Sequence, residues 1–150
     1  MFTVRDFAEP DFDELVTLWH ETNLLSYPYV RAHQEHSLAD ASHFFRNNVL
    51  AECRVWVAES ASRRHLGLVA LGGAWIRQLA VFPPFQRQGI GSALLREARK
   101  HSPGELRLYT FQRNLAARAF YEHHGFKVVR LGVSPAPEAE PDIEFRWQAA

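Results

Sequence analysis

Apolar residues are spaced in two different ways along the chain, and each spacing predicts one kind of element. Where they recur every three to four residues they form one face of a helix, and short β-branched or aromatic runs indicate strands. The runs typical of strands are residues 2–5, 54–60, 65–73, 75–82, 105–110, 126–132 and 142–147, and the segments with helical spacing are 12–19, 37–50, 92–101 and 113–124. The predicted order is β-α-α-β-β-β-α-β-α-β-β, a mixed α/β sheet domain with about four helices.

Local signals mark where several of these elements begin and end. Ser37 and Asp40 form an S-x-x-D capping signature before the second predicted helix. Gly125 is a good residue for the left-handed turn that ends the last helix. Residues 24–36 are rich in aromatic residues and histidine and are broken by Pro28, so an irregular connection is expected there.

Length and composition are those of a single-domain globular protein. A chain of 150 residues is expected to form one domain, 1–150, and 47% hydrophobic residues can fill its core. The 17 basic and 17 acidic side chains balance, which does not suit a general nucleic-acid binder. One cysteine, Cys53, fits a reducing compartment. With no signal peptide and no apolar stretch of ~20 residues, a soluble, cytoplasmic protein that does not enter a membrane is expected.

Candidate chemistry begins with six residues, QRQGIG, which run from Gln86 to Gly91 between a predicted strand and a predicted helix. A helix start leaves four backbone N–H groups without partners and carries about half a positive charge. Gly89 and Gly91 have no Cβ, so a ligand can approach this backbone closely. The combination predicts an anion site, with phosphate as the usual anion. A tight turn whose glycines serve only its shape explains the six residues equally well.

Two other kinds of phosphate loop fit this stretch less well. A P-loop needs a lysine and then Ser or Thr after its second glycine, and Ile90–Gly91–Ser92 offers no such lysine. A Rossmann loop needs three glycines within a parallel βαβ unit, and only two are present. A nucleotide-binding role is therefore disfavoured, also because no Mg²⁺ ligand accompanies the loop.

Two motifs of the chain resemble those of the GNAT superfamily of N-acetyltransferases. The first is the family signature Q/R-x-x-G-x-G/A, which the six residues match at Gln86, Gly89 and Gly91. The second is the family's N, A, FYE and GF series. Its matching positions are Asn114, Ala117, Phe120–Tyr121–Glu122 and Gly125–Phe126. The pair has the spacing of the family and covers about a third of the chain, so the signal is strong.

The resemblance implies acetyl-CoA as the donor and a mostly antiparallel sheet that splays between its fourth and fifth strands. The pantetheine arm of acetyl-CoA would lie in that gap against the fourth strand, and its pyrophosphate would sit on the backbone N–H groups of the loop. The implied cofactor-binding residues are Leu79, Ala80, Val81, Gln86, Arg87, Gln88, Gly89, Ile90, Gly91, Ser92, Asn114 and Phe120. Arg87, Arg113 and Arg118 are further candidates for its charged end, and solvated surface explains each of them as well.

The resemblance also makes Tyr121 the general acid of the reaction. A phenol with an unperturbed pKa of about 10 is protonated at neutral pH and can donate to the leaving thiolate. The spacing of Tyr121 with Ala117 and Phe120 also fits a core tyrosine on an amphipathic helix. Asn114 is expected to cap that helix and to contact the cofactor.

The general base is not identified by the sequence. Some members of the family place a glutamate on the fourth strand, but residues 75–82 contain no carboxylate. The candidates are His20, Glu21, His33, Glu144 or an ordered water. Eight histidines raise the question of a metal, but no cysteine or carboxylate pattern completes a zinc site, so none is expected.

Two functions remain to be distinguished. One is an N-acetyltransferase that moves the acetyl group to a primary amine of a small molecule or a peptide N-terminus. The other is a non-catalytic acyl-CoA-binding sensor or interaction module, and the hydroxyl of Tyr121 favours the enzyme. The acceptor amine is expected between residues 24–36 and 134–142, in a partly aromatic pocket that includes Tyr27, Tyr29, His33 and His36. A homodimer stays open, because dimers are the commonest closed assembly.

Overall fold

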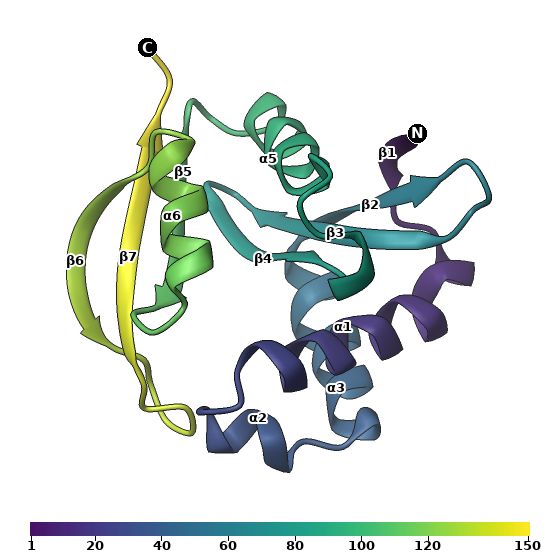
Figure 1. Cartoon of the computed structure of the whole chain (residues 1–150), viewed down its shortest axis with the longest axis horizontal. Helices are drawn as coiled ribbons and strands as arrows, with labels where there is room; N and C mark the ends of the chain where they lie inside the picture. The colour runs from purple at the N-terminus through teal and green to yellow at the C-terminus, as the bar shows by residue number, and fades with distance from the viewer.

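One seven-stranded sheet runs through the computed structural model, which describes all 150 residues (Figure 1). Its strand order is β1-β2-β3-β4-β5-β7-β6, and every neighbouring pair is antiparallel except β4 and β5. The strands are β1 (Phe2–Asp6), β2 (Arg54–Ser60), β3 (His65–Gly72), β4 (Trp75–Val81), β5 (Glu105–Phe111), β6 (Lys127–Val133) and β7 (Pro141–Gln148). The helices are α1 (Phe12–Ser26), α2 (Arg31–Glu35), α3 (Leu38–Phe44), α4 (Leu50–Glu52), α5 (Ile90–Lys100) and α6 (Leu115–His123). The predicted mixed α/β class is confirmed.

Helices cover both faces of the sheet, and each face has its own apolar core (Figure 1). On one face, α5 buries the stripe that includes Leu94 and Leu95. On the other face, α1 and α3 pack around Trp19, whose ring meets Phe45 at a centroid distance of 5.2 Å. Because β3 lies between the two layers, it is buried from His65 to Leu71 and apolar on both sides. None of the helices has the length and apolar character needed to cross a membrane.

β4 and β5 run parallel and pair only where they begin. Trp75 is opposite Arg107, and from there the strands diverge (Figure 1). β4 also bulges, since Gln78 pairs with Ala70 and Ile76 with Leu71, which leaves Arg77 without an opposite residue on β3. The predicted splay between the fourth and fifth strands is thus confirmed. Bulges of this kind are common beside active sites.

The differences from the sequence prediction lie in the helices. α1 continues to Ser26, and α2 lies within the connection that was expected to be irregular. The helix expected over 37–50 does begin at its predicted cap, where Ser37 Oγ accepts a hydrogen bond from the Asp40 N–H at 3.0 Å. It then passes through a π-helical segment, Phe45–Val49. A search for 3.6-residue periodicity does not detect π-turns. It ends α1 too early because residues 20–23 are polar and Leu25, near the end of the helix, is exposed.

Candidate active site

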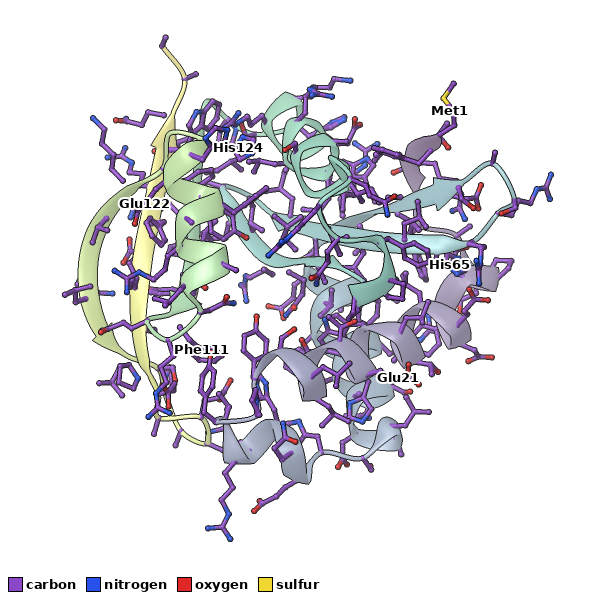
Figure 2. All side chains as sticks on the ribbon, in the orientation of Figure 1. Met1, Glu21, His65, Phe111, Glu122 and His124 are labelled. Carbon is purple, nitrogen blue, oxygen red and sulfur yellow. The ribbon has the colours of Figure 1, made fainter.

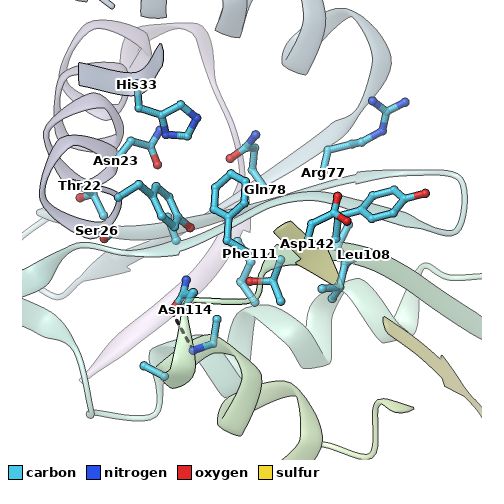
Figure 3. A pocket seen from close by; sticks show the side chains of 18 of the residues that line it. Thr22, Asn23, Ser26, His33, Arg77, Gln78, Leu108, Phe111, Asn114 and Asp142 are labelled. Carbon is cyan, nitrogen blue, oxygen red and sulfur yellow. Dashed lines mark hydrogen bonds between the residues drawn. The ribbon is translucent and has the colours of Figure 1, made fainter. Parts of the chain in front are cut away.

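The splay between β4 and β5 opens into a cavity of about 1260 Å³. We call its two parts the glycine end and the aromatic end. The glycine end is lined by Val81, Gly89, Gly91, Ser92, Asn114 and Phe120. The aromatic end is lined by Trp19, Tyr27, His33, Phe44, Tyr109 and Phe111 (Figure 3). One cavity therefore joins the start of α5 to the segments around α1 and α2.

The backbone at the glycine end has the geometry of an anion site. Gly89 is the N-cap of α5 and has a left-handed conformation, with φ 82° and ψ 4°. The first N–H to bond inside the helix is that of Ala93, which donates to the Gly89 C=O at 3.1 Å. The N–H groups of residues 90–92 have no partner within the helix. A Cβ added at Gly89 would meet nothing within 4 Å, so the space beside this backbone is open to a ligand.

Gly91 has a different structural role from Gly89. A Cβ at Gly91 would lie 3.3 Å from Cε1 of Phe120 and 3.6 Å from Cγ2 of Val81. The glycine therefore lets the ring of Phe120, on α6, pack against the first turn of α5. Ser92, the next residue, is bound through its Oγ to Nε2 of His124 at 3.1 Å.

The edge of β4 that faces β5 carries free backbone groups. The Phe82 N–H donates to the Leu66 C=O on β3 at 2.9 Å. Because successive residues of an antiparallel strand direct their backbone groups to opposite sides, Leu79 and Val81 point theirs into the gap, whereas Ala80 points its own toward β3. The Val81 C=O accepts a hydrogen bond from Nε2 of Gln86 at 3.0 Å. This bond connects β4 to the glycine loop, by which we mean residues 86–91. The N–H groups of Leu79 and Val81 are left for a ligand.

Tyr121 is a core residue that also reaches the cavity. It is 7% exposed, and its ring packs against Phe126 at a centroid distance of 5.3 Å. No protein group hydrogen-bonds its hydroxyl; burial, and next the neighbouring phenol of Tyr27, raise its pKa well above the usual range. The hydroxyl is therefore protonated at neutral pH, and it would break no hydrogen bond within the protein when it donates to a ligand. Both interpretations of this tyrosine, core residue and proton donor, fit its position.

The other residues that the sequence assigned to the cofactor are divided between cavity and surface. Asn114 caps α6, with its Oδ1 accepting the Ala117 N–H at 3.1 Å, and lines the cavity. The side chains of Gln88 and Ile90 do not line it; Gln88 is exposed and Ile90 lies in the core, so only their backbone is available there. The residues that do line it are Leu79, Ala80, Val81, Gln86, Arg87, Gly89, Gly91, Ser92, Asn114, Phe120 and Tyr121.

Of the three candidate arginines, only Arg87 lines the cavity. Arg113 is paired with Glu140 at 3.1 Å, and Arg118 donates to the Gln112 C=O at 3.1 Å. The prediction that charged side chains hold the far end of the cofactor therefore rests on Arg87 alone.

The aromatic end is organised around Phe111, which the sequence analysis did not single out. Phe111 projects from the end of β5 toward the segment that joins α1 and α2 (Figure 2). Its ring lies 5.2 Å from that of Tyr27 and 6.0 Å from that of His33, measured between centroids. Tyr29 also contacts Phe111, at 6.3 Å, but does not line the cavity. The pocket is therefore aromatic, as predicted, but it includes Phe111 and leaves out Tyr29.

The four candidate bases lie in different surroundings. His20 and His33 line the cavity, whereas Glu21 lines a separate, smaller pocket and lies well apart from Phe111 (Figure 2). Glu144 is buried and already engaged. Its carboxylate is bound by Arg107 at 3.0 Å, Arg130 at 3.1 Å and the hydroxyl of Tyr109 at 3.4 Å.

Asp142, at the start of β7, is a titratable cavity residue that the sequence analysis missed. Its side chain lines the cavity, and apart from its own backbone N–H no protein group hydrogen-bonds its carboxylate. Burial raises its pKa above the usual value, although Arg130 opposes this effect. Its only signal in the sequence is its place at the end of residues 134–142, where the acceptor was expected. No group of three His, Cys, Asp or Glu side chains is arranged to hold a metal ion.

Comparison with known proteins agrees with this geometry. A family model for the acetyltransferase (GNAT) domain matches residues 51–128, more than half of the chain. The chain is 28% identical over 127 residues to peptidyl-lysine N-acetyltransferase YiaC of Escherichia coli, with 84% of each chain covered. It is 29% identical over 133 residues to peptidyl-lysine N-acetyltransferase YjaB of Salmonella typhimurium, with 85% of each covered.

Solved structures share the fold across the whole chain. The solution structure of apo-form YjaB from Escherichia coli superposes with a TM-score of 0.80 at 23% identity, covering 100% of this chain and 99% of that one. The spermidine N-acetyltransferase from Vibrio cholerae, solved in complex with CoA and spermine, superposes with a TM-score of 0.74 at 19% identity, covering 98% and 95%. The splayed sheet, the paired motifs and the matching family model together show that the chain belongs to the GNAT family and is an acetyl-CoA-dependent N-acetyltransferase.

Proposed function

We propose that the enzyme acetylates the side-chain amine of lysine residues in proteins or peptides. The observation that carries the proposal is the composition of the cavity, where Asp142, whose carboxylate no other residue hydrogen-bonds, lines the same space as Tyr27, Tyr109 and Phe111. A lysine side chain has two matching parts, an aliphatic stem that packs on apolar surface and a single ammonium group. Two relatives that match over 84–85% of this chain carry the name peptidyl-lysine N-acetyltransferase.

The charges around the aromatic end favour a single ammonium group over a polyamine. Glu138 and Asp142 line the cavity, but so do Arg77 and Arg130. A polycation that followed this surface would meet two guanidinium groups, and like charges at close range repel. A lysine side chain presents one charge and can reach the carboxylate alone.

At the glycine end, the backbone N–H groups of residues 87–92 would hold the pyrophosphate of acetyl-CoA. The left-handed Gly89, the open space beside it and the free N–H groups at the start of α5 support this fit. Leu79 and Val81 would pair with the amides of the pantetheine arm, because a free strand edge binds another extended chain. Acetyl-CoA supplies the activated thioester, which these residues bring between β4 and β5.

Tyr121 would protonate the sulfur that leaves. Because burial raises the pKa of this phenol, a complete proton transfer to a thiolate is uphill, by about 1.36 kcal/mol for each unit of pKa difference. We therefore expect the phenol to donate as the amine loses its own proton, so that no free phenolate accumulates. The N–H of Leu79 or Val81 would polarise the carbonyl oxygen.

A matched set of acceptors tests the proposed function. The first is a peptide with a blocked N-terminus and one lysine, and the second is the same peptide with norleucine in place of lysine and a free N-terminus. Spermidine is the third acceptor, and release of free thiol from acetyl-CoA is the readout. Faster thiol release with the lysine peptide is expected. Turnover confined to the free N-terminus or to spermidine would contradict the proposal.

We further propose that residues 1–150 act as one catalytic domain in the cytoplasm. The fold match to YjaB extends over the whole chain, and Cys53, the single cysteine, is free. A homodimer stays a prediction.

A further inference from the structure

We propose that Asp142 is the catalytic base, which binds the ammonium group of the acceptor and removes its first proton. The ammonium group must lose a proton before it can attack, and the fourth strand carries no carboxylate that could take this proton. The identity of the amine as lysine rests on the proposed function, whereas the role of Asp142 applies to any primary amine that the enzyme acetylates.

The position of Asp142 suits this role. It lies opposite Phe111 on β5 and opposite Gly132 on β6. Its side chain is drawn with Gln78 and Phe111 around the same space in Figure 3. Only 8% of the residue is exposed, and it lines the cavity. Gly132 leaves room for its carboxylate, since a Cβ there would lie 3.2 Å from Oδ1.

None of the charged groups around Asp142 is hydrogen-bonded to its carboxylate, whose one protein donor is its own backbone N–H. Arg130 on β6 is the cation that lowers the pKa of Asp142, but its guanidinium is already bound to Glu144 and to the hydroxyl of Tyr109. Burial raises the pKa of Asp142, and the negative charge of Glu144 on β7 adds a smaller effect in the same direction. Arg77 on β4 and Glu138 in the β6–β7 loop line the same cavity. A carboxylate of raised pKa is a better proton acceptor than an ordinary one, and an ammonium group would supply the charged partner that Asp142 lacks.

The other titratable residues suit the role less well. His33 has one ring nitrogen, Nδ1, buried without a partner, and its Nε2 lies 3.9 Å from Glu138. Burial lowers the pKa of His33, which makes its ring a weaker proton acceptor. Glu144 has its carboxylate occupied by two arginines and a tyrosine. His20 stays as the alternative that the experiment must exclude.

The proton movements balance without any additional reagent. The carboxylate of Asp142 takes one proton from the ammonium, and the nitrogen lone pair then forms a bond to the thioester carbonyl carbon. The carbon–sulfur bond breaks, the sulfur takes the proton of Tyr121, and the second amine proton restores the Tyr121 phenol through solvent. Asp142 then releases its proton to water. The net change is ammonium and acetyl-CoA to amide, CoA thiol and one proton.

Asp142→Asn tests the inference, with Glu138→Gln as the matched control on the same cavity. We expect Asp142→Asn to lower kcat/KM by ~10²-fold or more, while the Kd for acetyl-CoA stays unchanged. Glu138→Gln should lower it much less. Asp142→Asn should also be at least as stable as the wild type at neutral pH, because it removes a buried charge without a partner. A purely structural role predicts the opposite, a less stable protein with normal turnover per folded molecule.

Two further measurements separate proton removal from simple positioning. The loss caused by Asp142→Asn should be smaller for an acceptor peptide whose amine is more acidic, such as an aminoethylcysteine in place of lysine, because that amine needs less help. In Asp142→Asn, kcat/KM should rise with pH in direct proportion to the fraction of the acceptor that is present as free amine. The proposal would be overturned if Asp142→Asn lowered kcat/KM equally for both amines. It would also be overturned if His20→Gln lowered kcat/KM by ~10²-fold while Asp142→Asn stayed near normal. If the wild type prefers another primary amine, the lysine assignment fails and the same comparison with that amine still decides the role of Asp142.

Discussion

Replacing Gly89 separates the role of the glycine loop in folding from its role in binding. Gly89 has φ 82°, and a Cβ there would touch no protein atom, so Gly89→Ala strains the backbone without any clash within the protein. A non-glycine residue in the left-handed region costs roughly 1–2 kcal/mol. At about 2–4 °C per kcal/mol for a chain of this size, the melting temperature should fall by roughly 2–8 °C.

Gly73, in the turn between β3 and β4, provides the matched control. It has φ 62°, and a Cβ there would likewise meet nothing within 4 Å, but it does not line the cavity. Gly73→Ala should therefore cost a similar stability and leave the ligand site intact. If the methyl of Gly89→Ala displaces one charge-assisted hydrogen bond to phosphate, about 1.5–3 kcal/mol is lost, which weakens the Kd for acetyl-CoA by roughly 10- to 100-fold.

The assay is titration calorimetry of acetyl-CoA at a temperature where both variants are folded, beside thermal unfolding of each. The expected pattern is equal destabilisation with weakened binding in Gly89→Ala only. Equal acetyl-CoA affinities in the two variants would show that Gly89 serves the shape of the turn and that the phosphates are held elsewhere.

Two further predictions concern stability. Burial alone lowers the pKa of His65 (Figure 2), but hydrogen bonds to Asp11 at 2.9 Å and Glu14 at 2.8 Å outweigh it, and the pKa is raised above its usual value. The charged imidazole thus stabilises the fold fully below about pH 6.5, and this contribution is lost as the pH rises through the higher folded-state pKa. Unfolding free energies measured from pH 5 to 9 should show this fall in the wild type and a flatter profile in His65→Gln; identical profiles would contradict it. Asn114→Ala should lose the cap of α6, about 1 kcal/mol, whereas Asn114→Ser should keep most of it, as thermal unfolding can test; equal stability of the two variants would count against the cap.

Sequence patterns predicted the parts of this fold that depend on local periodicity or local conformation. Strand β3 could be predicted because both of its faces are buried, and the left-handed turn at Gly125 could be predicted because glycine readily adopts a positive φ. Gly89 was singled out for its missing Cβ, and its positive φ was not predicted. The splay between β4 and β5 was not readable from spacing alone. It entered through the family resemblance, since an interrupted strand pairing is a property of two distant segments.

The aromatic end of the site shows what local patterns miss. Phe111 and Asp142 come together because β5 pairs with β7, and nothing in either segment indicates that register. Nothing in residues 134–142 indicates that the carboxylate at the end of this segment is buried, yet Asp142 is buried beside β6. The bulge at Arg77 depends similarly on the pairing of β3 with β4. Contacts at the site that depend on which strands pair, and in which register, could therefore be identified only from the structure.

The central claim is that Tyr121 supplies a proton during acetyl transfer, and Tyr121→Phe tests it most directly. The change removes one hydroxyl that has no protein partner, so the fold and the Kd for acetyl-CoA should change little. Tyr29→Phe is the control, because its buried hydroxyl also lacks a partner but lies outside the cavity. We predict that turnover of Tyr121→Phe on a good acceptor falls by ~10²-fold, about 2.7 kcal/mol of barrier, while Tyr29→Phe stays near the wild type. Unchanged turnover of Tyr121→Phe would contradict the account and leave Tyr121 as a packed core residue.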